Sequence, residues 1–178
     1  MKISFQNIQV EEKIAFQNVI SQRKQVHYKK MDGAFQKFIS IVVASGYHLK
    51  GPYFYSLNNA PIDEIVDIEM FIPIFENCFD TKNLATFNYH TYFEVGPVLK
   101  NSVTESFEKH TEQVYAELLA TLEINDLEIN TPFFHILPRD KAKYAYIYLG
   151  YTTNRLFLKD TEGEREWWLK VSNGLSWD

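Results

Sequence analysis

Apolar and polar positions alternate most clearly over residues 65–75, which read IVDIEMFIPIF. A period of two is typical of a β-strand, because successive side chains of a strand point to opposite faces of the sheet. Glu69 is the exception in this apolar run. A carboxylate there must be exposed on a sheet face, paired with another group or positioned for a cationic ligand, since an unpaired buried charge is costly.

The residues before this strand predict one long strand, a helix and a short aromatic strand. Residues 14–28 read as the long strand, Asp32 offers a helix N-cap and Gly46 offers the residue that ends the helix. Residues 53–57, between two turns, predict the aromatic strand. Apolar side chains at helical spacing predict a helix over residues 33–45: Phe35, Phe38, Ile39, Val42 and Val43.

The second half of the chain shows a similar succession of patterns. Residues 85–95 alternate and predict a strand, Gly96-Pro97 breaks it, and residues 131–137 and 143–151 predict two further strands. Between them an amphipathic helix is predicted over residues 103–122. Its apolar stripe contains Val103, Phe107, His110, Val114, Leu118, Leu119 and Leu122.

The two halves can be overlaid. GPYFYSL at 51–57 matches TPFFHIL at 131–137, and IEMFIPI at 68–74 matches AYIYLGY at 145–151. Each half is therefore predicted to be a β-α-β-β unit, about residues 14–76 and 85–151. Two such units close most simply as one α+β domain, residues 1–151, with pseudo-twofold symmetry and an antiparallel sheet covered by two helices on one face.

Residues 152–178 have no counterpart in the first half and predict a C-terminal extension that forms a hairpin. Trp167, Trp168 and Trp177 place large apolar rings in this otherwise polar segment. Two interpretations stay open: the rings cover the sheet edge, or they form a flap that binds a partner.

Composition restricts the class of protein. Apolar residues make up 46% and charged residues 23%, as in an ordinary globular protein, while 16% aromatics favour a sheet with an aromatic surface. A net charge of -5 argues against a nucleic-acid binder. No apolar run approaches a membrane span, no signal pattern opens the chain, and Cys78 is the only cysteine. The expectation is a cytoplasmic protein that binds neither nucleic acid nor membrane.

The duplicated unit, with the spacing D-x-E-x-x-x-P at Asp67, Glu69 and Pro73, resembles the GyrI-like family of bacterial small-molecule-binding domains. That resemblance implies a groove between the units for hydrophobic, often cationic ligands, with an acidic residue in the last strand of the second unit. This chain departs from the family there, since Tyr146 occupies the overlaid position and Gly150 replaces the closing proline. The carboxylate of Glu69 lies at the equivalent position of the first unit instead.

Two segments, SGYHLKGPYFYSLNN and IEMFIPI, also resemble an uncharacterised group of stand-alone bacterial proteins encoded near LXG-type polymorphic toxins. This resemblance implies a genomic setting, and with it a possible protein partner in a toxin or secretion system. The outer side of the second predicted helix is acidic and offers one surface for such a partner.

The candidate site is an aromatic groove with one carboxylate. Stacking and cation–π contacts on such a surface suit a flat or cationic ligand. The alternative is a wet sheet face on which Glu69 pairs with a lysine. The residues assigned to the groove are Glu69, Phe71, Tyr53, Tyr55, Phe133, His135, Tyr144, Tyr146 and Tyr148.

Motifs for catalysis, metals and cofactors are not evident. The five histidines lack metal-ligand spacing, and the chain has no P-loop, dinucleotide fingerprint or nucleophile elbow. Tyr146 and Glu69 could together transfer a proton, which is the one enzymatic indication. The sequence therefore predicts a non-catalytic binding protein without metal or cofactor. Two alternatives remain: an interaction accessory of a toxin system, and a hydrolase on the same scaffold.

Overall fold

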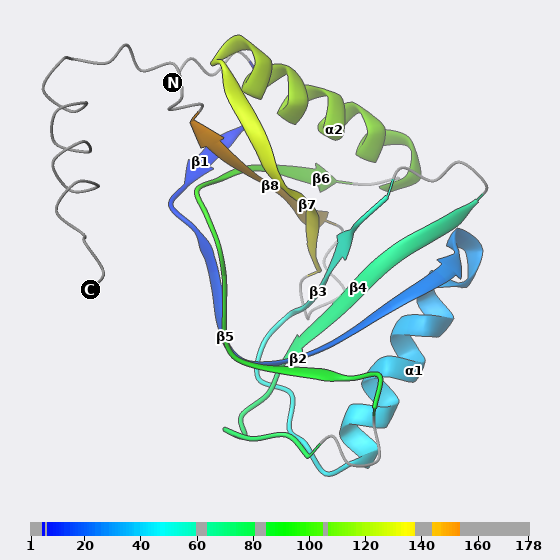
Figure 1. Cartoon of the computed structure of the whole chain (residues 1–178). Coiled ribbons are helices and arrows are strands. Elements are labelled where there is room, and N and C mark those ends of the chain that lie inside the picture. Colours follow the sequence, from blue (N-terminus) through cyan, green and yellow to red (C-terminus); the bar gives the residue numbers. More distant parts are fainter. Residues whose placement is uncertain are drawn as a thin grey trace, which may run out of the picture.

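The computed structural model describes residue 5 and residues 7–59, 64–80, 85–104, 107–137 and 144–153. Its strands form one antiparallel sheet in the order β1-β6-β8-β7-β3-β4-β2-β5, which curls into a half-barrel (Figure 1). The strands are β1 Gln9–Glu11, β2 Ile14–His27, β3 Tyr53–Leu57, β4 Ile65–Pro73, β5 Asn88–Val95, β6 Val98–Thr104, β7 Leu127–Leu137 and β8 Tyr144–Thr153. The helices are α1 Met31–Ala44 and α2 Phe107–Ile124, and a 3-10 turn, η1 Tyr28–Lys30, precedes α1.

Two β-α-β-β units lie side by side in this sheet. The first is β2-α1-β3-β4 and the second is β6-α2-β7-β8, and the units join where β3 pairs with β7. Tyr55 faces His135 across this junction. The register also agrees with the sequence overlay, because Ser56 pairs with Glu69 in the first unit as Ile136 pairs with Tyr146 in the second. The predicted α+β fold with two helices on one face of an antiparallel sheet is confirmed.

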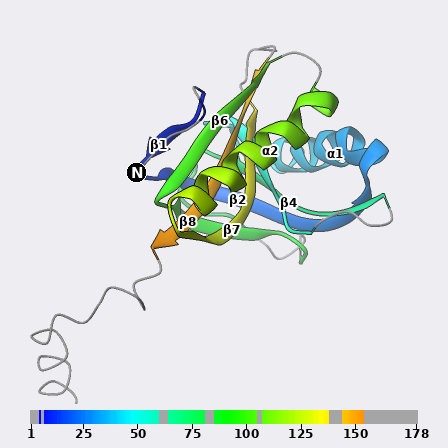
Figure 2. The ribbon, with the colours of Figure 1, turned by 90° about the horizontal axis from the view of Figure 1, so that it is seen from above.

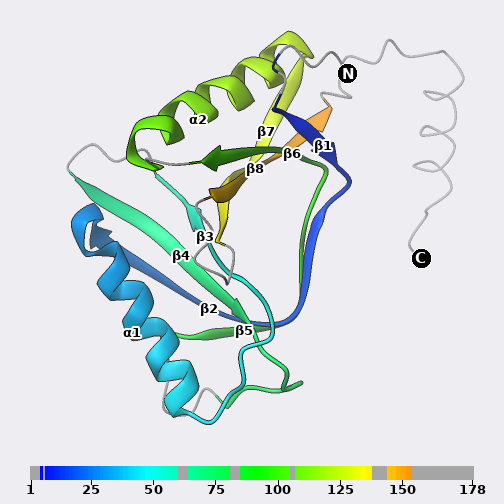
Figure 3. The ribbon, with the colours of Figure 1, turned by 180° about the vertical axis from the view of Figure 1, so that it is seen from behind.

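The second unit begins with a different strand from the one predicted. Residues 85–95 do contain a strand, β5, but it pairs with β2 at the edge of the sheet (Figure 3). The strand that corresponds to β2 is β6, which pairs with β8 as β2 pairs with β4. The prediction that a helix begins at Val103 was therefore wrong, since Val103 belongs to β6 and α2 begins at Phe107. Two strands in succession, separated by Gly96-Pro97, resembled one strand followed by a helix start.

The first helix also starts earlier than expected. The N-cap of α1 is Lys30, and Asp32 lies within the first helical turn. The C-terminal extension was predicted to start at Thr152, but Thr152 and Thr153 belong to β8. The rest of the extension, with its predicted hairpin, lies outside the described residues. In the described part of the chain, neither helix is long and apolar enough to cross a membrane.

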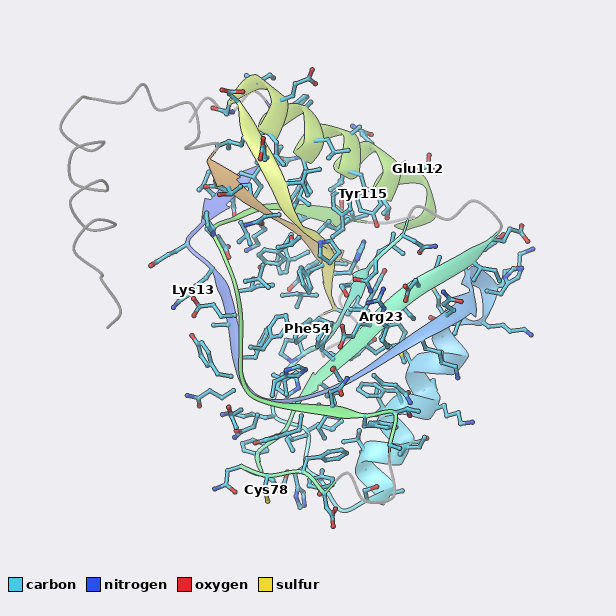
Figure 4. The ribbon with its side chains drawn as sticks, viewed as in Figure 1. Lys13, Arg23, Phe54, Cys78, Glu112 and Tyr115 are labelled. Atoms are coloured by element: carbon cyan, nitrogen blue, oxygen red, sulfur yellow. The ribbon has the colours of Figure 1, made fainter. Side chains whose placement is uncertain are left out.

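Apolar side chains are buried on both faces of the sheet. On the face that carries α1 and α2 (Figure 2), here called the helix side, Phe38 and Met70 belong to one buried cluster, and Leu118 and Leu149 belong to another. The opposite face is the inner face of the curl. Figure 4 shows Phe54 inside this curl, where it lies within an aromatic cluster. The inner cluster comprises Phe16, Phe54, Phe71, Phe93 and Phe134. Burying each such ring contributes roughly 1.5–3 kcal/mol.

Candidate ligand-binding site

A cleft of about 350 Å³ lies on the helix side, over the junction of the two units. One wall comes from α1, which contributes Asp32 and Phe35, and the floor comes from the central strands. Tyr55 and His135 meet on this floor with their rings stacked, 4.4 Å between centroids and 6° between planes. The pairing of β3 with β7 places these two rings next to each other, because directly opposed residues of neighbouring strands share one face.

His135 is the central polar group of the floor. The hydroxyl of Tyr115, on α2, lies 2.7 Å from its Nε2 atom, whereas its Nδ1 atom is buried without a hydrogen-bond partner. Burial lowers the pKa of His135 to about 3, so the ring is neutral at physiological pH. Burial likewise raises the pKa of Tyr115. The floor therefore presents neutral aromatic groups, and the unpaired Nδ1 atom of His135 is buried.

Asp32 supplies the negative charge of the cleft. It is exposed in the first turn of α1 and lines the cavity. The pKa of Tyr55 is raised by burial and, secondarily, by the charge of Asp32. Sequence reasoning missed this carboxylate because it treated Asp32 as a helix cap. Asp32 reaches the cleft because α1 packs over the central strands, and the local sequence pattern does not specify this packing.

The structure separates the predicted site residues into two groups. Tyr53, Tyr55, Phe133 and His135 lie on the helix side, where Tyr55 pairs with Met70 of β4. The others lie on the inner face: Glu69, Phe71, Tyr144, Tyr146 and Tyr148. One groove lined by both groups is therefore not formed, because Tyr55 stands opposite Met70 and Glu69 stands opposite Ser56. Even and odd positions of a strand belong to different faces.

Glu69 has a local partner on the inner face. Ser21 donates a hydrogen bond from its Oγ atom to Oε1 of Glu69 over 2.7 Å, and Nε2 of His90 lies 3.1 Å from the same Oγ. Ser21 is completely buried and gives its proton to the carboxylate, so this trio lacks the order of a nucleophilic triad, in which histidine takes the serine proton. Glu69 and Tyr146 cannot share a proton directly, since β3 and β7 lie between their strands.

The corresponding place in the second unit contains a lysine paired with a glutamate. In the overlay of the two halves, Tyr148 corresponds to Phe71. Lys100 pairs with Tyr148 and Ser21 pairs with Phe71, so Lys100 occupies the position of Ser21. Its Nζ atom lies 4.3 Å from the ring centroid of Tyr146 and 2.7 Å from Oε1 of Glu11. A lysine of the chain itself therefore occupies the tyrosine surface that the sequence suggested for a ligand. Among the described residues, no group of three or more histidine, cysteine or acidic side chains could hold a metal ion.

Comparisons with known proteins agree with this architecture. Residues 15–151 match the model of a family described as "Domain of unknown function (DUF5085)". EcmrR, in the cryo-EM structure of its DNA complex, has a TM-score of 0.64 at 13% identity, covering 84% of this chain and 59% of EcmrR. The crystal structure of the EcmrR C-terminal domain has a TM-score of 0.58 at 13% identity, covering 82% and 96%.

A crystal structure of a hydrolase from Listeria innocua has a TM-score of 0.54 at 11% identity, covering 82% of this chain and 92% of that one. A comparison with curated proteins finds no match. At these identities the likeness to the solved structures shows the fold alone.

Proposed function

The chain belongs to the DUF5085 family, and we propose that it is a non-catalytic domain that binds a flat, hydrophobic small molecule in the cleft between α1 and α2. The observation that carries this proposal is the cavity of about 350 Å³ over the stacked Tyr55 and His135 rings, with Asp32 at its side. Pockets that bind small molecules are concave, mostly apolar and supplied with a few polar groups, as this one is.

The charge of the cleft favours a cation over an anion. His135 is neutral, and Asp32 is the acidic side chain among the described residues that line the cavity. A positively charged ring would gain from the Asp32 carboxylate and from contact with the ring of Tyr53. The GyrI-like resemblance, which implies a groove between the two units, supports this reading of the cleft. With a net charge of -5, direct contact with nucleic acid is not part of the proposal.

Replacing Asp32 by asparagine is expected to weaken binding of ethidium, a flat aromatic cation, by about 1.4- to fivefold, because an exposed ion pair contributes roughly 0.2–1 kcal/mol. Affinity would be measured by fluorescence titration. Phenanthridine, a neutral relative of the probe, is expected to bind Asp32→Asn and wild type equally, since it has no charge to lose.

Glu69→Gln is the matched control, because Glu69 lies on the other face of the sheet and is bonded to Ser21. It is expected to leave the ethidium affinity unchanged. If wild type does not bind ethidium, or if Glu69→Gln weakens binding while Asp32→Asn does not, the proposed cleft is wrong.

A further inference from the structure

The strand β2 extends beyond its neighbour β5 and leaves part of one edge unpaired. β5 pairs with β2 only as far as Ser21, which stands opposite Asn88, whereas β2 continues to His27 (Figure 1). β4 covers the other edge of β2 over residues 22–27. Within the described part of the chain, no strand pairs with this end of β2 on the β5 side. An unpaired edge offers backbone N–H and C=O groups to an added strand.

The backbone groups of Arg23 and Gln25 point to this open edge. The N–H of Tyr28 donates a hydrogen bond to the carbonyl of Glu64, just before β4. Hydrogen-bonding directions alternate along an antiparallel strand, so the even-numbered residues at this end of β2 bond toward β4 and the odd-numbered residues point the other way. Arg23 and Gln25 therefore each present an N–H and a C=O to a segment laid beside β2.

A groove of about 870 Å³ lies along the open edge, between the end of β2 and the helix α1. Lys24 and Val26 line it from the strand, and Gly33, Ala34 and Lys37 line it from the helix. The helix is narrow here, because a Cβ atom added at Gly33 would meet no atom of another element within 4 Å. The groove therefore has open space beside the strand edge, where an added backbone would lie.

The groove is strongly basic. Besides His27, which lies 3.0 Å from Oε2 of Glu64, the titratable side chains that line it are four exposed lysines: Lys24, Lys29, Lys30 and Lys37. Among the described residues, no carboxylate forms an ion pair with any of these lysines. The whole chain carries a net charge of -5, so this groove is a local concentration of positive charge. Such a surface favours an acidic partner.

The helix α1 separates this basic groove from the cleft of the proposed function. Asp32 and Phe35 line the cleft, whereas Gly33, Ala34 and Lys37 line the groove. The two sites have opposite charge and share no lining residue. Binding in the groove therefore does not require that the cleft bind a cation.

We propose that the basic groove binds an extended acidic segment of a protein partner, which adds as a strand to the open edge of β2. The segment pairs with the backbone of Arg23 and Gln25. Lys24 shares the helix side of β2 with Val26, which packs against the buried cluster beneath α1. Acidic side chains at alternate positions of the segment point to this same side and meet the lysines.

A capped, fluorescein-labelled peptide in which glutamate and threonine alternate over six residues is the probe, titrated into the full chain and followed by fluorescence anisotropy. Wild type is expected to bind it saturably, with an affinity that falls as salt rises. Gly33→Leu is expected to weaken binding by about tenfold or more, because the new side chain fills the groove. Lys37→Gln is expected to weaken it by about 1.4- to fivefold, the effect of one exposed ion pair, and Lys50→Gln, outside the groove, to leave it unchanged.

A second peptide separates strand addition from simple charge attraction. It has the same sequence but carries methyl groups on the backbone nitrogens of its threonines, which would pair with Arg23 and Gln25. This peptide keeps its charge and cannot donate to β2, so we expect it to bind about tenfold more weakly or less tightly still.

Several outcomes would overturn the proposal. These are no saturable binding of the first peptide, equal affinities for the two peptides, and unchanged affinity in folded Gly33→Leu. If Gly33→Leu does not fold, the methylated peptide decides. Tighter binding of a double-stranded oligonucleotide than of the peptide would identify the groove as a site for nucleic acid. Competition between ethidium and the peptide would place the peptide in the first cleft, and it would likewise contradict the proposal.

Discussion

Replacing Phe54 by alanine is expected to lower the free energy of unfolding by about 3–5 kcal/mol, the usual cost of truncating a buried aromatic side chain. Phe54 is completely buried at the centre of the inner face. Its ring stacks on Phe71 at 4.8 Å and on Phe16 at 4.8 Å, and it contacts Phe93 at 5.3 Å. These residues come from four strands, so the cavity left by the substitution would loosen the contacts that hold the curl of the sheet.

The measurement is urea denaturation followed by circular dichroism, which gives the midpoint and the free energy of unfolding. Phe75→Ala is the matched control, because Phe75 is 63% exposed and its truncation should change stability by less than about 0.5 kcal/mol. Phe54→Leu, which retains most of the apolar volume, should fall between the two. Equal stabilities for Phe54→Ala and Phe75→Ala would contradict the inner aromatic core.

The elements that could be predicted from the sequence are those whose apolar spacing matches the side chains that the fold buries. The alternation around Met70 specifies a strand, and the apolar positions around Phe38 have the spacing of a helix. The overlay of the two halves agrees with the register inside each unit, because duplicated units repeat the same strand pairing. A duplicated pattern thus carries three-dimensional information that a single pattern does not.

The error in the second half has a specific physical cause. β5 and β6 are both strands, yet their alternation does not say which strand each will pair with. β5 adds to β2 at the edge of the sheet, and β6 takes the symmetric place beside β8. Pairing of this kind depends on contacts between residues about 80 positions apart, such as Phe16 with Phe93. Local periodicity contains no such information.

The candidate site was only partly predictable for a related reason. The prediction that Tyr55 and His135 correspond depended on the overlay, and the structure places them together. The assignment of Glu69 to the same surface required the register between β3 and β4, where Glu69 stands opposite Ser56 rather than Tyr55. The partner that explains a carboxylate in an apolar strand, Ser21, lies 48 residues earlier in the chain. A shift of one residue in register moves every side chain to the other face.

The stability of the protein is expected to fall steeply with acid because of His135. Burial lowers the pKa of this residue to about 3, whereas in the unfolded chain it lies near 6.5. Between these two values the unfolded chain binds a proton that the folded protein does not, so stability decreases as the pH falls. Each pH unit in this window costs about 1.4 kcal/mol, which amounts to about 2–3 kcal/mol between pH 6.5 and pH 4.5.

His135→Gln isolates this effect, because glutamine does not titrate and can still bond to Tyr115. The free energy of unfolding would be measured for both proteins at pH 7.5 and pH 4.5, and wild type is expected to lose about 2–3 kcal/mol more than the variant. Equal losses in wild type and His135→Gln would show that the folded protein accommodates a protonated His135. The floor of the cleft would then carry a positive charge in acid, and binding of an aromatic cation would weaken over the same pH range.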